Sequence, residues 1–288
     1  MNTIYHNGSY IPASEAKISP YDRSFLFGEG LFETFRSYDG TFPFLEAHVT
    51  RLEWSSTYFG FTFPEDLNFE GICTTLLEKN SLKDARFKIV LSGIPRDFSK
   101  ATAQPMPLLE SEYETQILIY CEHLLEEHVS EPAKLKVIKN YVNDAMPLAA
   151  VKTTNYLLKM RARMIAKEAG YDDGILLNHH GMVTETCTGN LFWLDTNSTL
   201  WTVMDDQGLL SGIMRKFTID LLKENKLNIK EGVISPKDLS HAKEIFMTNS
   251  VVGIKPVVSI DDRQISGGEI GDITHMIKEL WDKQISSR

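Results

Sequence analysis

Hydrophobic and polar positions alternate along the first 120 residues in a way that predicts strands interrupted by two helices. Asn7-Gly8 separates two short apolar runs and predicts a hairpin, because both residues tolerate positive φ. Residues 31–38 alternate like a strand, and Asp39-Gly40 is expected to turn them into a second hairpin with residues 41–45. Two helices and two buried strands complete this stretch, over residues 46–58, 66–79, 86–91 and 115–121.

The second half of the chain repeats this mixture after an acidic, proline-ended segment at residues 122–132. A helix is expected at 155–169, with an apolar stripe of Tyr156, Leu157, Met160 and Met164. The other expected elements are strands at 134–141, 174–177, 182–186, 190–194, 199–204 and 244–248, and helices at 213–225 and 269–285.

These strands come in runs and do not alternate strictly with helices, which indicates an α+β fold. A chain of 288 residues is long enough for two domains that share a cleft. We therefore expect an N-terminal α/β domain at 1–122, an interdomain linker at 123–132 and a C-terminal domain at 133–288.

Composition excludes several classes of protein. The net charge of -9 without any basic run argues against nucleic-acid or anionic-membrane partners, since their phosphates are met mainly by Lys and Arg. The sequence has no signal-peptide pattern and no apolar stretch that would span a membrane, so a cytosolic location is expected. The three cysteines are far apart, and His179-His180 precedes Gly181 as in a hairpin turn, so neither disulfides nor a metal site are expected.

Three short segments carry candidate chemistry, although each also has an ordinary structural interpretation. Lys152 precedes Thr153-Thr154-Asn155, residues suited to a helix start, where a partly desolvated lysine can act as a nucleophile or proton carrier. Otherwise it is a solvated surface charge. Glu185 is either an exposed carboxylate or one that faces a heterocyclic nitrogen. Ser211-Gly212-Ile213 begins a helix whose free N–H groups suit a phosphate.

The glycines of Phe27-Gly28-Glu29-Gly30 do not form a dinucleotide-binding motif. Glu33 stands where the third glycine would be, and a strand pattern follows where that motif requires a helix. We therefore reject a Rossmann fold.

Taken together and in order, these segments resemble the class IV aminotransferases, the fold-type IV pyridoxal-phosphate enzymes that include branched-chain and D-amino-acid aminotransferases and 4-amino-4-deoxychorismate lyase. The similarity covers nearly the whole chain. The matching segments are 22–36, 48–52, 152–156, 185 with 190–192, 212–213, and 248–250 with 256–257.

The resemblance implies a role for individual residues. Lys152 would form the Schiff base with pyridoxal 5'-phosphate and shuttle the proton, and Glu185 would hold the pyridine nitrogen. Arg51 would bind the phosphate, because a guanidinium matches phosphate oxygens, although on a helix face it could equally be a surface ion-pair partner. The further cofactor-binding residues implied are Tyr156, Ile213, Met214, Asn249 and Ser250, and the substrate-binding residues are Phe32, Arg96 and Phe98. The family also implies a homodimer.

Within the family, the motifs favour 4-amino-4-deoxychorismate lyase. Branched-chain aminotransferases usually carry an extra residue before the Asn-Tyr pair, and D-amino-acid aminotransferases typically have a histidine where this chain has Phe98. The segments 212–217 and 248–250 are similar to those of the lyases, and Ser211 replaces a proline common in the aminotransferases. A D-amino-acid or branched-chain aminotransferase is the alternative, and a non-catalytic binding protein that retains the fold is a third.

Overall fold

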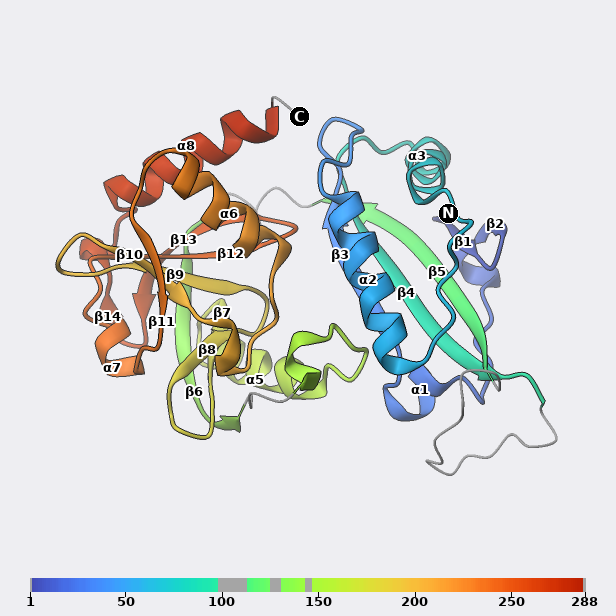
Figure 1. Cartoon of the computed structure of the whole chain (residues 1–288), viewed down its shortest axis with the longest axis horizontal. Helices are drawn as coiled ribbons and strands as arrows, with labels where there is room; N and C mark the ends of the chain where they lie inside the picture. Colours follow the sequence, from blue (N-terminus) through green and yellow to red (C-terminus); the bar gives the residue numbers. More distant parts are fainter. Residues whose placement is uncertain (1, 98–112, 125–130, 143–146, 287–288) are drawn as a thin grey trace. The chain divides into compact units, whose positions relative to one another are not determined.

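The computed structural model describes residues 2–97, 113–124, 131–142 and 147–286 (Figure 1). The chain forms two compact units. Unit 1 comprises Met1–Leu124 and Val151–Tyr156, and unit 2 comprises Leu125–Ala150 and Leu157–Arg288. The short segment around Lys152 therefore returns to the first unit after the chain has already entered the second.

Unit 1 is built on a five-stranded sheet with the strand order β2-β1-β5-β4-β3. All pairs along this order are antiparallel. The strands are β1 (Thr3–His6), β2 (Ser9–Pro12), β3 (Leu31–Arg36), β4 (Ala85–Pro95) and β5 (Tyr113–His123), and the helices are α1 (Arg23–Phe27), α2 (Leu45–Phe59), α3 (Phe69–Asn80) and the 3-10 turn η1 (Ala13–Glu15).

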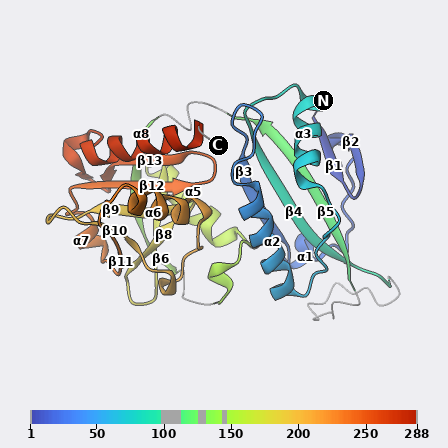
Figure 2. The same cartoon turned by 45° about the horizontal axis from the view of Figure 1, so that its top comes forward.

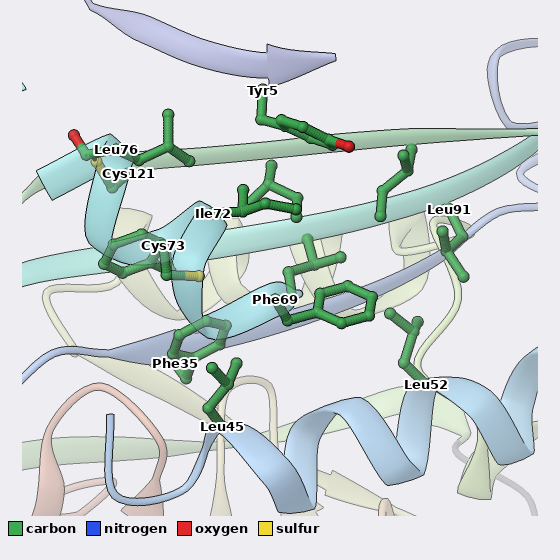
Figure 3. Packing of buried hydrophobic residues seen from close by; sticks show 14 of the residues in the cluster. Tyr5, Phe35, Leu45, Leu52, Phe69, Ile72, Cys73, Leu76, Leu91 and Cys121 are labelled. Carbon is green, nitrogen blue, oxygen red and sulfur yellow. Dashed lines mark hydrogen bonds between the residues drawn. The ribbon is translucent and has the colours of Figure 1, made fainter. Parts of the chain in front are cut away.

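The core of unit 1 lies between this sheet and the helices α2 and α3. Every second residue of β4 from Ala85 to Leu91 is fully buried, as expected for a strand with one covered face. Leu45 and Leu52 point from α2 toward the cluster that contains Phe35 and Phe69 (Figure 3). The predicted helices at 46–58 and 66–79 are confirmed, because their apolar stripes form this core.

The first predicted hairpin is confirmed and the second is wrong. Asn7 and Gly8 adopt φ of 47° and 90°, which lets β1 and β2 pair tightly. Residues 41–45 form no strand: only an isolated bridge joins Tyr38 to Thr41, and Leu45 already begins α2. Pro43 has no N–H to give to a ladder, and β3 pairs with β4 instead.

Unit 2 contains a nine-stranded sheet in which eight strands follow the order β11-β10-β9-β12-β13-β6-β7-β8, and β14 pairs with β13. The strands are β6 (Ala133–Val142), β7 (Asp173–Leu177), β8 (Val183–Thr186), β9 (Asn190–Leu194), β10 (Leu200–Val203), β11 (Ile229–Gly232), β12 (Glu244–Asn249), β13 (Gly253–Ile260) and β14 (Arg263–Gln264). The helices are α5 (Leu157–Glu168), α6 (Ile213–Glu224), α7 (Pro236–Leu239) and α8 (Asp272–Ser286), with 3-10 turns at Pro147–Ala150, Asp205–Gln207 and Ser266–Gly268.

Helices cover this sheet from outside. The helix α8 lies along β12 and β13 (Figure 2), α6 contacts β12, and α5 contacts β6 and β7. The helix α5 was expected to use its stripe of large apolar residues, but Leu157 is 77% exposed and Met160 and Met164 are about half exposed. Ala162 and Ala166 are buried instead, so α5 packs on the sheet through its small side chains.

Two further outcomes concern the histidine pair and membrane-spanning helices. The His179-His180 pair lies in the turn between β7 and β8, where Gly181 has φ of 74°, as predicted. Among the described residues no helix is both long and apolar enough to cross a membrane.

Candidate active site

The segment that carries Lys152 is attached to the outer edge of β3 in unit 1. The Phe32 N–H donates to the Lys152 carbonyl at 2.9 Å, and Leu31 and Thr153 form an antiparallel bridge. The Thr154 N–H donates to the Gly30 carbonyl at 2.8 Å. Lys152 is therefore held by backbone hydrogen bonds at its own carbonyl and at Thr154, and its position does not depend on its own side chain.

The glycines at 28 and 30 allow this close approach. Gly28 ends α1 with φ of 70°, and a Cβ there would lie 2.9 Å from the Asn155 Cβ. The Gly30 N–H donates to the Thr154 hydroxyl at 3.1 Å, and the Ser24 hydroxyl donates to the same oxygen at 3.1 Å. Gly28 and Gly30, which do not form a dinucleotide-binding motif, therefore leave room for the segment that carries Lys152.

We expect Gly30→Ala to displace this segment. The new Cβ would lie 2.6 Å from the Ser24 Cβ and 2.9 Å from the Thr154 hydroxyl, too close without movement. Overpacking of this kind costs about 1–3 kcal/mol of unfolding free energy. The thermal unfolding temperature (Tm) and the rate of turnover should both fall. The double variant Ser24→Gly/Gly30→Ala removes the Ser24 side chain but leaves the Thr154 hydroxyl, so it should recover part of the loss. No recovery would contradict this account.

The Lys152 ammonium lies beside two aromatic rings. Its Nζ is 4.5 Å from the centre of the Phe32 ring and 5.6 Å from that of Tyr156, and the two rings meet edge to face at 5.5 Å. The Lys88 Nζ is also 4.4 Å from the Phe32 ring centre, and burial, with Arg86 nearby, lowers the pKa of Lys88. Two lysine ammonium groups thus lie over the Phe32 ring. One of them, Lys88, was not predicted as a site residue.

Arg51 forms part of a buried cluster with Glu33 and His48. The Arg51 guanidinium donates to both Glu33 oxygens, from Nε to Oε1 and from Nη2 to Oε2, each at 2.7 Å. His48 Nδ1 is 2.7 Å from the Glu33 Oε2, and the His48 and Glu33 side chains are 0% and 1% exposed. Such a two-point carboxylate contact fixes the plane of the guanidinium.

The charges of this cluster are strongly coupled. Burial alone would raise the pKa of Glu33, but the charge and hydrogen bonds of Arg51, helped by His48, outweigh it and lower this pKa from 4.5 to about 2. Burial lowers the pKa of His48, against the opposing effect of Glu33. The cluster therefore holds a carboxylate, a guanidinium and a neutral imidazole at neutral pH.

In unit 2, Glu185 lies in β8, where every residue is buried. Its side chain is 3% exposed, and the Lys159 ammonium on α5 donates to its Oε1 at 2.8 Å. Of the two interpretations of Glu185, the exposed carboxylate is therefore wrong, because a strand covered on both faces leaves it no access to solvent.

The start of α6 is shaped by Gly212 and Asn190. A Cβ on Gly212 would overlap the Asn190 side-chain oxygen, and the Asn190 amide donates to the Leu210 carbonyl at 2.9 Å. Gly212 offers no side chain to cap the first N–H groups of α6, which belong to Ile213 and Met214. These donors, together with the positive end of the helix dipole, suit an anion.

The turn after β12 lies next to this region. Thr248 is paired with Asn190 across the β9–β12 ladder, and within the described residues its buried hydroxyl finds no hydrogen-bond partner. The Asn249 side chain accepts the Val251 and Val252 N–H groups at 3.0 Å and so shapes the turn that contains Ser250. A buried hydroxyl without a partner is costly, and a phosphate would supply an acceptor.

The predicted substrate-binding residues have different outcomes. Phe32 is buried beside Lys152, whereas Arg96 is exposed just after the end of β4. Phe98 lies outside the described residues. The roles of all three toward a substrate stay predictions.

The sequence analysis missed four polar residues of these clusters: Glu33, His48, Lys88 and Lys159. Glu33 had a detectable sign, since it stands on the inward side of β3 together with Leu31 and Phe35. Lys159 had none, because its partner Glu185 is 26 positions away in the sequence.

The donor set suits pyridoxal 5'-phosphate. A lysine beside aromatic rings, a buried carboxylate and an oriented guanidinium match its aldehyde, ring nitrogen and phosphate, as does a helix start that, in the described part of the chain, has no side-chain cap and a neighbouring unpartnered hydroxyl. Each unit carries part of this set.

Comparison with known proteins supports the same family. The profile of the amino-transferase class IV family matches residues 30–260. The chain is 33% identical to a Methanocaldococcus jannaschii protein named, provisionally, as a branched-chain-amino-acid aminotransferase, with 96% of this chain and 94% of that protein covered. It is 30% identical to the aminodeoxychorismate lyase of Bacillus subtilis, with 99% and 95% covered.

Solved structures agree with the sequence relatives. The branched-chain amino acid aminotransferase of Escherichia coli superposes with a TM-score of 0.86 at 26% identity, covering 96% of this chain and 92% of that one. The T.th. branched-chain amino acid aminotransferase with pyridoxamine 5'-phosphate shares the fold, with a TM-score of 0.85 at 24% identity and 100% and 95% covered. The predicted fold-type IV architecture is confirmed, and the chain belongs to the class IV aminotransferases, a family of enzymes that depend on pyridoxal phosphate.

Proposed function

We propose that this enzyme is a 4-amino-4-deoxychorismate lyase, which converts 4-amino-4-deoxychorismate into 4-aminobenzoate and pyruvate. The observation that carries the proposal is the start of α6. There Gly212 fits against Asn190, and Arg215 is buried with hydrogen bonds to the Val203 carbonyl at 2.7 Å and to Glu231 at 2.5 Å. This is one of the two segments whose sequence resembles the lyases, and the Bacillus subtilis lyase matches the chain over nearly its full length.

In the proposed reaction, Lys152 binds the cofactor through its Nζ and moves the proton of the amine-bearing carbon. The bound cofactor supplies an electron sink. Glu185 keeps the ring nitrogen protonated, while Arg51, the amides of Ile213 and Met214, and Ser250 hold the phosphate. The remaining cofactor contacts fall to Tyr156 and Asn249.

On the substrate side, Arg96 binds a carboxylate, with Phe32 and Phe98 as the aromatic wall. Loss of the ring proton and of the enolpyruvyl group makes the product ring aromatic, and the released enolpyruvate becomes pyruvate. Proton removal by Lys152 is common to lyase and aminotransferase, so the choice between them depends on the pocket. The homodimer and the cytosolic location belong to the same proposal.

An aminotransferase is the second candidate, and the relatives favour the branched-chain type. The Methanocaldococcus jannaschii relative has the higher identity of the two reported above, and the Escherichia coli branched-chain enzyme is 27% identical over 96% of this chain. A D-alanine aminotransferase of Staphylococcus haemolyticus is 26% identical over the whole chain. These activities differ from the lyase in transferring the amino group to a keto acid.

Product analysis distinguishes the candidates. The purified holoenzyme is given 4-amino-4-deoxychorismate, and pyruvate is measured with lactate dehydrogenase and 4-aminobenzoate by its fluorescence. Parallel reactions contain L-leucine or D-alanine with 2-oxoglutarate. We expect pyruvate and 4-aminobenzoate in equal amounts. Amino transfer from either amino acid, with no 4-aminobenzoate formed from 4-amino-4-deoxychorismate, would reject the lyase and leave the cofactor chemistry intact.

A further inference from the structure

The ion pair between Lys159 and Glu185 is not explained by holding the fold alone. The Lys159 Nζ lies 2.8 Å from the Glu185 Oε1, and the two side chains are only 17% and 3% exposed. Glu185 is also the carboxylate that the proposed function assigns to the cofactor's ring nitrogen. When the cofactor is bound, the same carboxylate therefore faces two cations, the Lys159 ammonium and the protonated ring.

The packing of α5 brings Lys159 to this place. Ala162 lies one turn after Lys159 on the same face of α5, and it is fully buried, as is Ala166. Both alanines pack against Ile138, Leu176 and Cys187 of the unit 2 core. Their small side chains let α5 approach the sheet closely, and the long lysine stem then reaches Glu185 in β8.

A buried carboxylate needs a counter-charge at all times. Val183, Thr184 and Thr186, the neighbours of Glu185 in β8, are 0% exposed, so water does not solvate its charge. An uncompensated charge in such a place costs several kcal/mol. In the protein without cofactor, Lys159 supplies the compensating charge.

We propose that Lys159 is a positioning residue that stands in for the cationic ring of the cofactor: it neutralises Glu185 before loading and afterwards shares the carboxylate with the ring nitrogen. This inference rests on the proposed role of Glu185. Two cations on one carboxylate repel each other, so Lys159 stabilises the empty protein and weakens the grip on the ring. The ligand class that competes with Lys159 is a protonated heteroaromatic ring.

Two readouts that do not require turnover test the proposal: the Tm of the apoprotein, and its affinity for pyridoxamine 5'-phosphate. This ligand has the ring and phosphate but no aldehyde to react with Lys152. The variants are Lys159→Gln, Lys159→Arg, Glu185→Gln and the double variant Lys159→Gln/Glu185→Gln. Lys167→Gln is the matched control, since Lys167 is an exposed lysine of the same helix that pairs with Asp172.

We expect Lys159→Gln to lower the Tm of the apoprotein by about 5–10 °C, because Glu185 loses the charge of Lys159. In the Glu185→Gln background the same change should have little effect, and Lys159→Arg should retain most of the stability. Pyridoxamine 5'-phosphate should bind Lys159→Gln about tenfold more tightly than the wild type, and should raise its Tm further. Lys167→Gln should change neither readout.

The outcomes separate this inference from the proposed function. Equal Tm losses from Lys159→Gln with and without Glu185 would show that the pair contributes nothing and would overturn the proposal. If pyridoxamine 5'-phosphate binds the wild type and Lys159→Gln equally, charge sharing is wrong although the cofactor assignment stands. If it binds neither variant nor wild type, the cofactor assignment itself fails, whatever the Tm values show. Should Lys159→Gln not fold, the comparison of Lys159→Arg with the wild type carries the affinity test, with unchanged affinity expected and a tenfold change contradicting it.

Discussion

Lys152→Ala should abolish turnover while leaving the fold intact. The variant loses the proposed nucleophile and proton carrier, and loss of proton transfer alone removes a factor of about 10²–10⁴ in rate. The fold should persist, because the hydrogen bond from Phe32 and the bridge from Leu31 involve only the backbone of this segment. The measurement is steady-state turnover together with the intact mass after borohydride treatment, which fixes the cofactor on the wild-type lysine.

Lys167→Ala serves as the matched control, since this lysine is about half exposed and pairs only weakly with Asp172 at 3.5 Å. It should retain wild-type turnover and the mass increase after borohydride. A mass increase that persists in Lys152→Ala would show that another lysine carries the cofactor, and would reject the assignment of Lys152.

Glu33→Gln is expected to cost about 3–5 kcal/mol of unfolding free energy, because it breaks a buried ion pair and leaves the Arg51 charge facing an amide. The guanidinium also loses the second carboxylate oxygen that fixes its plane. Affinity for pyridoxamine 5'-phosphate should therefore fall roughly tenfold or more. Chemical denaturation and ligand titration measure the two effects.

The stability difference between the wild type and Glu33→Gln should depend on pH. The pKa of Glu33 is lowered from 4.5 in the unfolded chain to about 2 in the folded protein, so its contribution is complete above pH 4.5 and is lost as the pH falls toward 2. The stability difference between wild type and Glu33→Gln should shrink by about 3 kcal/mol across this window. Glu53→Gln, which changes an exposed carboxylate of the same helix as Arg51, is the matched control. A difference that stays constant from pH 6 to 3 would refute the assigned ionisation.

Elements with a strong hydrophobic period could be predicted from the sequence. The helices α2, α3 and α6 begin and end within about three residues of the expected bounds, because each buries one apolar stripe. Several shorter or irregular elements escaped, among them α1 and β13. The helix α1 is a five-residue segment capped by Asp22, too short for any period, and β13 contains Pro256, a residue that sequence patterns rarely place inside a strand.

The partners of the candidate site residues could not be predicted, because they are distant in the sequence. The motifs identified Lys152, Glu185 and Arg51 as residues of interest, yet nothing local indicated that Arg51 would be bound to Glu33 or Glu185 to Lys159. The same limit applies to α5. Its large apolar residues suggested the buried face, but close packing against the sheet required alanines.

The return of residues 151–156 to unit 1 has a consequence for biosynthesis. The edge of β3 acquires its backbone partner only from a segment encoded well after β5, so a nascent chain released at residue 124 would hold the sheet but lack Lys152 and the bridge at Thr153. Lys152 therefore joins unit 1 late in synthesis, when the ribosome has already begun unit 2. A genetic dissection of this enzyme into two separately expressed halves would have to cut after Tyr156 to keep Lys152 with the strand that holds it.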